Sequence, residues 1–276
     1  MPDQQSRAAR RFRLYGPDDL AAVPLFAGGF INFGYWRGIP LDAPLSVEQR
    51  VASQRALYRL VLDTLAVGPT DHVIEVGCGQ GVGSALAVTD YHAALVRGVD
   101  VLSQQIDRAR QRNAEVIAAD PERLRFRQGS ASAIPFPEAS FTALLSVEAA
   151  QHFEDLPGFT AESFRVLRPG GRLVVSTFFA TGPTHADPLA AMLQTFADGI
   201  DLATDIRALL DLLRGAGFTD VSAHSIGEAV WPGWDRWLSQ TADDVWASNW
   251  LAAYRRGLLD YYLVSAHKPG EALSNP

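Results

Sequence analysis

The chain has 276 residues, a net charge of −7 and 47% hydrophobic residues, which suits one large domain with an ample core. The sequence pI is about 5.3 and the only basic cluster, residues 7–13, is expected to be a solvated segment, so nucleic acid is not an expected partner. A single cysteine, Cys78, excludes an intramolecular disulfide and fits a reducing cytoplasm. No apolar run of about 18 residues occurs, so no membrane span is expected, and residues 1–13 lack the apolar core of a secretory signal.

Glycines and prolines punctuate the first part of the chain, so residues 1–45 are predicted to be irregular, with a dense aromatic patch at 30–36. A helical pattern follows over 46–65, with Ser46 as N-cap and Gly68-Pro69 as the stop. Strands and helices then alternate. Strands are predicted at 72–76, 95–100, 124–128, 141–146 and 172–179, and helices at 81–88, 103–119 and 158–167.

The rhythm changes after the fifth strand. Helices are predicted at 187–200, 204–215 and 231–254, the last rich in tryptophan, and strands at 220–226 and 259–267. Strands separated by helices of this length predict an α/β fold with a doubly wound, mostly parallel sheet. We expect 187–200 and 231–254 to cover the carboxyl edge of the sheet, which is where open α/β sheets bind ligands.

One loop points to a nucleotide-like ligand. Residues 73–83 read VIEVGCGQGVG, with four glycines directly behind an apolar strand. Glycines permit positive φ and a close backbone approach, and a helix start offers free N–H groups. The G-x-G-x-x-G pattern of dinucleotide loops fits imperfectly, because Val82 or Ser84 stands where the third glycine should be.

Glu75 stands inside the strand that leads into this loop. A buried carboxylate is costly unless a positive or hydrogen-bonding group meets it. A pyrophosphate would not favour that neighbour, whereas a positively charged ligand would. The loop therefore favours a cationic nucleoside over a dinucleotide.

The pattern Glu75-x-Gly77-x-Gly79-x-Gly81 resembles motif I of the class I S-adenosylmethionine-dependent methyltransferases. Residues 166–173, VLRPGGRL, are similar to a late motif of the same family, and the closest branch is the ubiquinone/menaquinone and natural-product one. The resemblance implies S-adenosylmethionine as cofactor and a seven-stranded Rossmann-like sheet with helical lid insertions. It also implies one domain over 1–276, with a lid at 1–45, a cofactor core at 46–180, and cap insertions and last strands at 181–276.

The resemblance also implies roles for residues along the chain. Asp100, ending the second strand, would accept both ribose hydroxyls. Residues 128–137 resemble the loop that brackets the adenine, with Ser130 in place of the usual Asp and the N–H of Ala131 near the ring. The complete implied cofactor set is Tyr35, Glu75, Gly77, Cys78, Gly79, Gly81, Asp100, Val101, Gln105, Ser130, Ala131, Ser146, Val147 and Glu148.

His152, four residues beyond Glu148, is the predicted general base, because an imidazole titrates near working pH. The alternative is a histidine that only caps or orients a loop. The remaining histidines and the single cysteine have no zinc-ligand spacing, so no metal is expected.

Aromatic residues suggest where the acceptor binds. The segment Asn32-Phe-Gly-Tyr-Trp36 resembles a His-x-Gly-Tyr-Trp-like lid in related enzymes, with Phe33 at the histidine position. The predicted substrate pocket comprises Phe33, Trp36, Phe178, Phe179, Trp231 and Trp234, which would suit a large apolar acceptor. Plain core packing and a homodimer contact remain alternatives for these side chains.

The sequence thus predicts a cytoplasmic enzyme that methylates a small, largely apolar metabolite, on a hydroxyl oxygen in a natural-product pathway. Methylation of carbon or nitrogen, and a cyclase that keeps the cofactor as a structural ligand, remain alternatives. An NAD-dependent oxidoreductase is a weaker one, because Glu75 and the glycine spacing argue against it.

Overall fold

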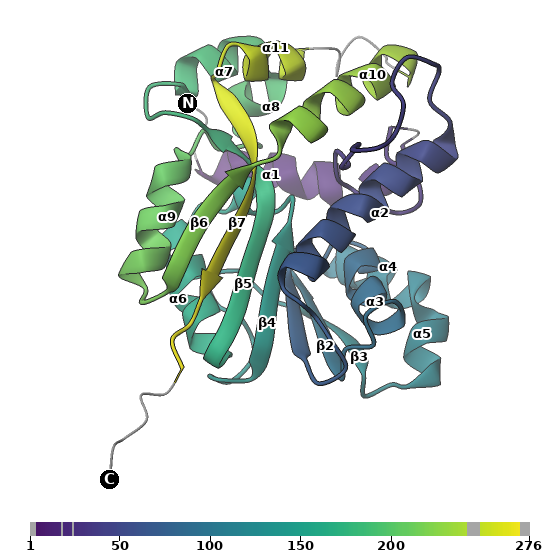
Figure 1. The fold of residues 1–276 in the computed structure, drawn as a ribbon, viewed down its shortest axis with the longest axis vertical. Coiled ribbons are helices and arrows are strands. Elements are labelled where there is room, and N and C mark those ends of the chain that lie inside the picture. Colours follow the sequence, from purple (N-terminus) through teal and green to yellow (C-terminus); the bar gives the residue numbers. More distant parts are fainter. Residues whose placement is uncertain (1–3, 18, 24, 242–248, 271–276) are drawn as a thin grey trace.

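A single seven-stranded sheet organises the molecule (Figure 1). The computed structural model describes residues 4–17, 19–23, 25–241 and 249–270. The strand order is β3-β2-β1-β4-β5-β7-β6; β1 to β5 pair in parallel and β7 is antiparallel to both neighbours. This confirms the predicted mostly parallel sheet. The strands are β1 His72–Val76, β2 Leu95–Asp100, β3 Leu124–Gln128, β4 Phe141–Val147, β5 Leu167–Ala180, β6 Thr219–Ser225 and β7 Leu259–His267.

Helices cover both faces of the sheet, as a doubly wound fold requires (Figure 1). On one face lie α2 Val47–Thr64, α3 Val82–Thr89, α4 Ser103–Arg112 and α5 Ala114–Ala119; on the other lie α6 Leu156–Val166 and α9 Ile206–Gly215. Local sequence fixes where they begin. Ser46 and Gln49 form a capping box on α2, and the carboxylates of Asp155 and Asp205 accept backbone N–H groups at the starts of α6 and α9.

A third group of helices gathers beyond the carboxyl ends of the strands (Figure 1). It consists of α7 Ala186–Met192, α8 Gln194–Ala197, α10 Trp231–Thr241 and α11 Asn249–Arg255, with short 3₁₀ turns at Leu20–Ala22, Ala150–His152 and Gly227–Ala229. The predicted cap is therefore present. The predicted helix over 231–254 is two helices, and residues 242–248 between them lie outside the described residues. Within the described chain, no helix has the length and hydropathy needed to cross a bilayer.

The prediction that residues 1–45 are irregular is wrong for residues 4–15. Helix α1, Gln4–Tyr15, consists mostly of good helix formers, and apart from Pro2 the glycines and prolines follow it. The basic cluster is also not simply solvated. Arg10 Nη1 lies 2.9 Å from Asp198 Oδ1, and Arg11 forms a salt bridge with Glu154. These two contacts hold α1 across the carboxyl edge of the sheet.

Aromatic side chains fill the space between α10, α11 and the sheet. The ring of Phe33 stacks on Trp234 with centroids 4.4 Å apart and on Phe178 with centroids 5.6 Å apart. Trp231 stacks on Trp250 at 5.6 Å, and all five rings are buried. This cluster attaches the cap to the sheet as a second part of the core.

Gly233 of α10 packs directly on this cluster, and we expect Gly233→Ala to destabilise the fold. A Cβ at Gly233 would lie 2.1 Å from Cγ of the buried Trp36, so the helix or the indole must move. Overpacking of this kind costs about 1–3 kcal/mol, which outweighs the gain in helix propensity. Urea unfolding measures the change. The matched control is Gly215→Ala in α9, whose Cβ would meet nothing within 4 Å; equal stability of the two variants would contradict this packing.

Candidate active site

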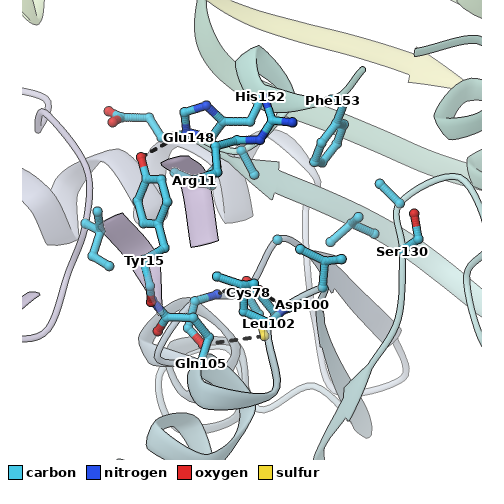
Figure 2. Close-up of a pocket in the computed structure, with 18 of the residues that line it drawn as sticks. Arg11, Tyr15, Cys78, Asp100, Leu102, Gln105, Ser130, Glu148, His152 and Phe153 are labelled. Atoms are coloured by element: carbon cyan, nitrogen blue, oxygen red, sulfur yellow. Dashed lines mark hydrogen bonds between the residues drawn. The ribbon is translucent and has the colours of Figure 1, made fainter. Parts of the chain in front are cut away.

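A cavity of about 720 Å³ opens at the carboxyl ends of β1 to β4 (Figure 2). Its floor comes from the loops that follow these strands, and its roof from α1 and the segment 29–31. Pockets of this size hold small molecules and cofactors. Figure 2 shows Tyr15, Glu148 and His152 grouped on one side of the cavity and Asp100, Cys78 and Gln105 on the other. The topology of the sheet therefore brings most of the predicted residues to one place.

The glycine loop forms the centre of the floor. Gly77, Gly79 and Gly81 have φ values of 78°, 51° and 70°, a region that favours glycine. The N–H groups of Gly77 and Cys78 both donate to the Val99 carbonyl, which fastens the loop to β2. A Cβ at Gly77 would lie 2.3 Å from Cβ of Ala149, whereas one at Gly79 would meet no protein atom within 4 Å. The backbone at Gly79 is thus open to the cavity.

Asp100 lies beside this loop with its carboxylate held in place. Oδ2 accepts the N–H of Gly79 at 3.0 Å and Oδ1 accepts the N–H of Leu102 at 3.0 Å. Burial raises the pKa of Asp100 above its usual value. Each oxygen keeps a further lone pair, so the carboxylate presents two parallel acceptors to the cavity.

Other members of the predicted cofactor set also line the cavity, namely Gly77, Cys78, Gly79, Val101, Gln105, Ser130, Ala131, Val147 and Glu148. Gln105 has a second contact, because its Nε2 donates to the Tyr15 carbonyl at 2.7 Å. Gln105, a predicted cofactor-binding residue, is therefore hydrogen-bonded to the last residue of α1. Ser130 and Ala131 follow β3, where the adenine was expected.

Four members of that set lie elsewhere, namely Tyr35, Glu75, Gly81 and Ser146. Strand alternation explains two of them, because Val76 and Val147 line the cavity and the preceding Glu75 and Ser146 side chains point away from it. Glu75 Oε2 accepts the Ser84 hydroxyl at 2.5 Å, on the first turn of α3. The expectation that Glu75 faces a ligand charge is therefore corrected: it sits behind the loop.

The other two have structural positions. Gly81 is the N-cap of α3, and a Cβ there would lie 2.3 Å from the Phe126 ring. Tyr35 lies away from the cavity, where its N–H donates to the Ser53 carbonyl and the Arg37 guanidinium lies over its ring. Tyr35 therefore lies outside the cavity, whereas Gly81 stands between the lining residues Gln80 and Val82 but has no side chain to present.

His152 lines the cavity with a defined tautomer. Its Nδ1 lies 2.9 Å from the Ile200 carbonyl, which can only accept, and 3.2 Å from Asp201 Oδ1. Nδ1 therefore carries the proton, and Nε2 is the acceptor for the Tyr15 hydroxyl at 3.0 Å. Burial lowers the pKa of His152 below its ordinary value, against the opposing effect of Asp201. The imidazole is thus a neutral base with its lone pair on the cavity side.

The predicted substrate pocket is not part of the cavity. Phe33, Trp36, Phe178, Phe179, Trp231 and Trp234 are all buried, and none of them lines it. Five of them pack against other rings of the cap cluster or against Arg50, and Phe179 belongs to the core on the other face of the sheet. These residues form core, which corrects the prediction. The apolar wall of the cavity instead comes from Phe12, Phe30, Ile31 and Phe153.

Comparisons with known proteins agree with this geometry. A family model described as a methyltransferase domain matches residues 74–175. The O-methyltransferase cnsE of Penicillium expansum is 31% identical over 74% of this chain and 71% of that protein. Erythromycin 3''-O-methyltransferase of Saccharopolyspora erythraea is 28% identical over 96% of this chain and 91% of its own. A solved geranyl diphosphate methyltransferase, in complex with GPP and sinefungin, superposes with a TM-score of 0.79 at 20% identity, over 95% of this chain and 99% of that one.

The chain belongs to the class I S-adenosylmethionine-dependent methyltransferases. Its residues fit that cofactor. The open backbone at Gly79 would take the methionine and ribose portion, Asp100 would accept the ribose hydroxyls, and Ser130 and Ala131 would border the adenine. When bound, S-adenosylmethionine supplies an electrophilic methyl group on a sulfonium.

Several residues of the methyltransferase site were not predicted. Tyr15 and Arg11 come from α1, whose helix was not expected, and Asp201 lies after α8, far along the chain from His152. A partial signal existed only for Gln80, which stands inside the glycine motif and lines the cavity. The others come together through tertiary packing, which leaves no local pattern.

Proposed function

We propose that this methyltransferase transfers a methyl group to a hydroxyl oxygen of a small, largely apolar natural product, with His152 as the general base. The observation that carries the proposal is the Nδ1–H tautomer of His152, whose Nε2 lone pair lies at the cavity. The attack of a neutral hydroxyl needs a base, because the proton must leave as the bond forms. Two relatives over most of the chain are named O-methyltransferases, which supports oxygen as the acceptor atom.

Tyr15 connects the base to the acceptor. Its hydroxyl donates to His152 Nε2 and both residues line the cavity (Figure 2). In the proposed route, the acceptor O–H proton passes to the Tyr15 oxygen as the Tyr15 proton passes to Nε2. Asp201 then stabilises the imidazolium through Nδ1 at 3.2 Å. The phenol already carries the acceptor's proton at this point, and the imidazole returns to its neutral state when it loses its extra proton to solvent.

The remaining chain residues position the reactants and exclude water. Helix α1 covers the cavity and is held by the Arg11–Glu154 salt bridge and by Gln105 on the Tyr15 carbonyl. Phe12, Phe30 and Phe153 give the acceptor an apolar surface. This wall, rather than the cap cluster, supports an acceptor with a large apolar body.

We also propose that the enzyme works in the cytoplasm on free small molecules, which fits its single cysteine and net charge of −7. The tryptophan-rich segment does not support a homodimer contact, because Trp231, Trp234 and Trp237 are buried within the chain. Sedimentation equilibrium of the purified protein would decide the oligomeric state.

The test is a turnover screen with S-adenosylmethionine carrying a labelled methyl group and a panel of hydroxylated polyketides, terpenoids and glycosides. We expect release of S-adenosylhomocysteine and an O-methyl product identified by mass spectrometry and NMR. A labelled methyl group on carbon or nitrogen would show that the methylated atom is not oxygen. Conversion of an acceptor without gain of label would favour the cyclase, and NADH binding in place of S-adenosylhomocysteine would favour the oxidoreductase.

A further inference from the structure

Two glutamates lie near the cavity, and they differ in burial and in what they face: Glu75 is fully buried, whereas Glu148 is partly exposed. Glu75 is behind the glycine loop, whereas Glu148 lines the cavity at the end of β4. The other carboxylates on the wall already have partners: Asp100 binds two backbone N–H groups, Glu154 pairs with Arg11, and Asp155 caps α6. Unlike Glu154, Glu148 has no ion-pair partner among the described residues, and unlike Asp100 it keeps one oxygen to which no described residue donates.

The backbone and one oxygen of Glu148 are fixed. Its φ is +46°, an uncommon value for a residue with a side chain, and such strain concentrates at functional sites. Its N–H donates to the Ser176 carbonyl at 2.8 Å. Oε1 accepts the Phe33 N–H at 2.6 Å and the Tyr261 hydroxyl at 2.8 Å. No described residue donates to Oε2, so this oxygen is the one available to the cavity.

No cation of the described chain forms an ion pair with Glu148. The nearest candidate, Arg50 of α2, donates to the carbonyls of Leu25 and Asn32 instead. The Asn32–Phe33 peptide therefore lies between the two charges, because its carbonyl accepts from Arg50 and its N–H donates to Glu148. The guanidinium acts on the carboxyl only at a distance, and the carboxyl lacks a direct counter-charge.

The other ionisable groups that act on Glu148 come from several elements. They are Tyr15 of α1, Arg50 and Tyr58 of α2, Asp201 after α8, and Tyr261 of β7. Burial has a larger effect than any of these groups and raises the pKa of Glu148 to about 8, while Arg50 opposes this rise. At neutral pH the carboxyl is mostly protonated until a positive charge reaches it.

Glu148 lies at the reactive end of the cavity. Gln151 Nε2 donates to the backbone carbonyl of Glu148 at 3.0 Å and lies 3.2 Å from His152 Nε2, so one side chain contacts both the base and the backbone of Glu148. Asp100 and Ser130, on the nucleoside side, belong to other strands. A sulfonium placed for transfer to an acceptor near His152 is thus closer to Glu148 than to the nucleoside-side acid.

We propose that Glu148 distinguishes the positively charged cofactor from its neutral product. The carboxyl loses its proton to solvent when the sulfonium of S-adenosylmethionine binds, and gains one back when neutral S-adenosylhomocysteine remains. The charge attraction exists only before transfer, which favours exchange of product for fresh cofactor. The proposal rests on the proposed place of the acceptor near His152, but its tests use no acceptor and do not depend on oxygen as the methylated atom.

The test is calorimetric titration of wild type and Glu148→Gln with S-adenosylmethionine and with S-adenosylhomocysteine. The amide keeps an acceptor for the Phe33 N–H and the Tyr261 hydroxyl but cannot ionise. We expect the Kd for S-adenosylmethionine to rise about tenfold and that for S-adenosylhomocysteine to change less than about threefold. An equal change for both ligands, or no change for either, would overturn the proposal.

A second measurement uses wild type alone and does not depend on folding of the variant. Titration at pH 7 in buffers of different ionisation enthalpy counts the protons released on binding. The α-amino group is common to both ligands, so the difference between them reports the response of the protein to the sulfonium charge. We expect close to one extra proton with S-adenosylmethionine; equal proton release with both ligands would refute the proposal.

The matched control is Glu75→Gln, the same change at the glutamate behind the glycine loop. Burial raises the pKa of Glu75 to about 7, but its side chain holds Ser84 and does not line the cavity. We expect this variant to change affinity for both ligands by the same factor. If it alters the ratio of the two affinities and Glu148→Gln does not, the charge-sensing residue is Glu75.

Discussion

His152→Ala should lower turnover about 10²- to 10⁴-fold, the range that a positioned general base contributes. The imidazole accepts the Tyr15 hydroxyl on Nε2 at the cavity, with its proton fixed on Nδ1 by Ile200 and Asp201. Affinity for S-adenosylhomocysteine should change little, because Asp100 and the glycine loop lie on the other side of the cavity. Steady-state kinetics with calorimetry on the same preparation separates the two effects.

Tyr15→Phe tests how the base reaches the acceptor. If the phenol relays the proton, its removal should lower turnover nearly as much as His152→Ala, and the double variant should lose little more. His224→Ala on the exposed face of β6 is the control for replacing a histidine. Unchanged turnover in His152→Ala would refute the base, whereas loss there with full activity in Tyr15→Phe would show direct contact between imidazole and acceptor.

The same assignment predicts the pH profile. Burial lowers the pKa of His152, so the neutral base persists below pH 6.5 and the acid limb of kcat/KM should fall below that value. A limb above pH 6.5 would point to another group, and Glu148 with a pKa of about 8 is the first to consider.

The fold followed from sequence where local patterns carried the signal. The cap at Ser46 marks the start of helix α2 in the sequence. Gly77, Gly79 and Gly81 likewise mark the loop that joins a strand to the next helix. Helix α1 was not predicted because the glycines and prolines after Tyr15 dominate the pattern of residues 1–45, although residues 4–15 have high helix propensity.

The site was predictable only as far as strand ends are. Asp100, Val147, Glu148 and His152 follow strands whose carboxyl ends meet at one edge, so their convergence comes with the topology. Successive side chains of a strand point to opposite faces of the sheet, so an error of one residue reverses the predicted direction. This is why Glu75 and Ser146 point away from the cavity while Val76 and Val147 line it.

The aromatic residues failed as predictors for a different reason. A pocket lining and a core both require apolar rings, and composition does not separate them. Phe33 and Trp234 stack at 4.4 Å, which leaves no room between them. Only the packing of α10 against the segment around Trp36 decides the outcome, and that packing involves residues about two hundred positions apart.

Asp100→Ala should weaken S-adenosylhomocysteine binding about a hundredfold. The loss combines two charge-assisted hydrogen bonds to the ribose with the backbone contacts that hold Gly79 and Leu102 in place. Calorimetric titration gives the affinity, and a melting curve shows whether the loop still folds. Asp100→Asn separates charge from shape, because the amide keeps one acceptor oxygen and should recover part of the affinity.

The control for Asp100→Ala is Asp107→Ala on α4, an exposed carboxylate that contacts only Arg110 among the described residues. It removes the same charge from the same region of the protein without touching the cavity, so its affinity should match wild type. If both variants lose affinity equally, the loss comes from the removal of negative charge in general and not from the contact between Asp100 and the ribose. If Asp100→Ala binds as wild type does, the ligand hydroxyls are held by another group and the orientation proposed for the cofactor is wrong.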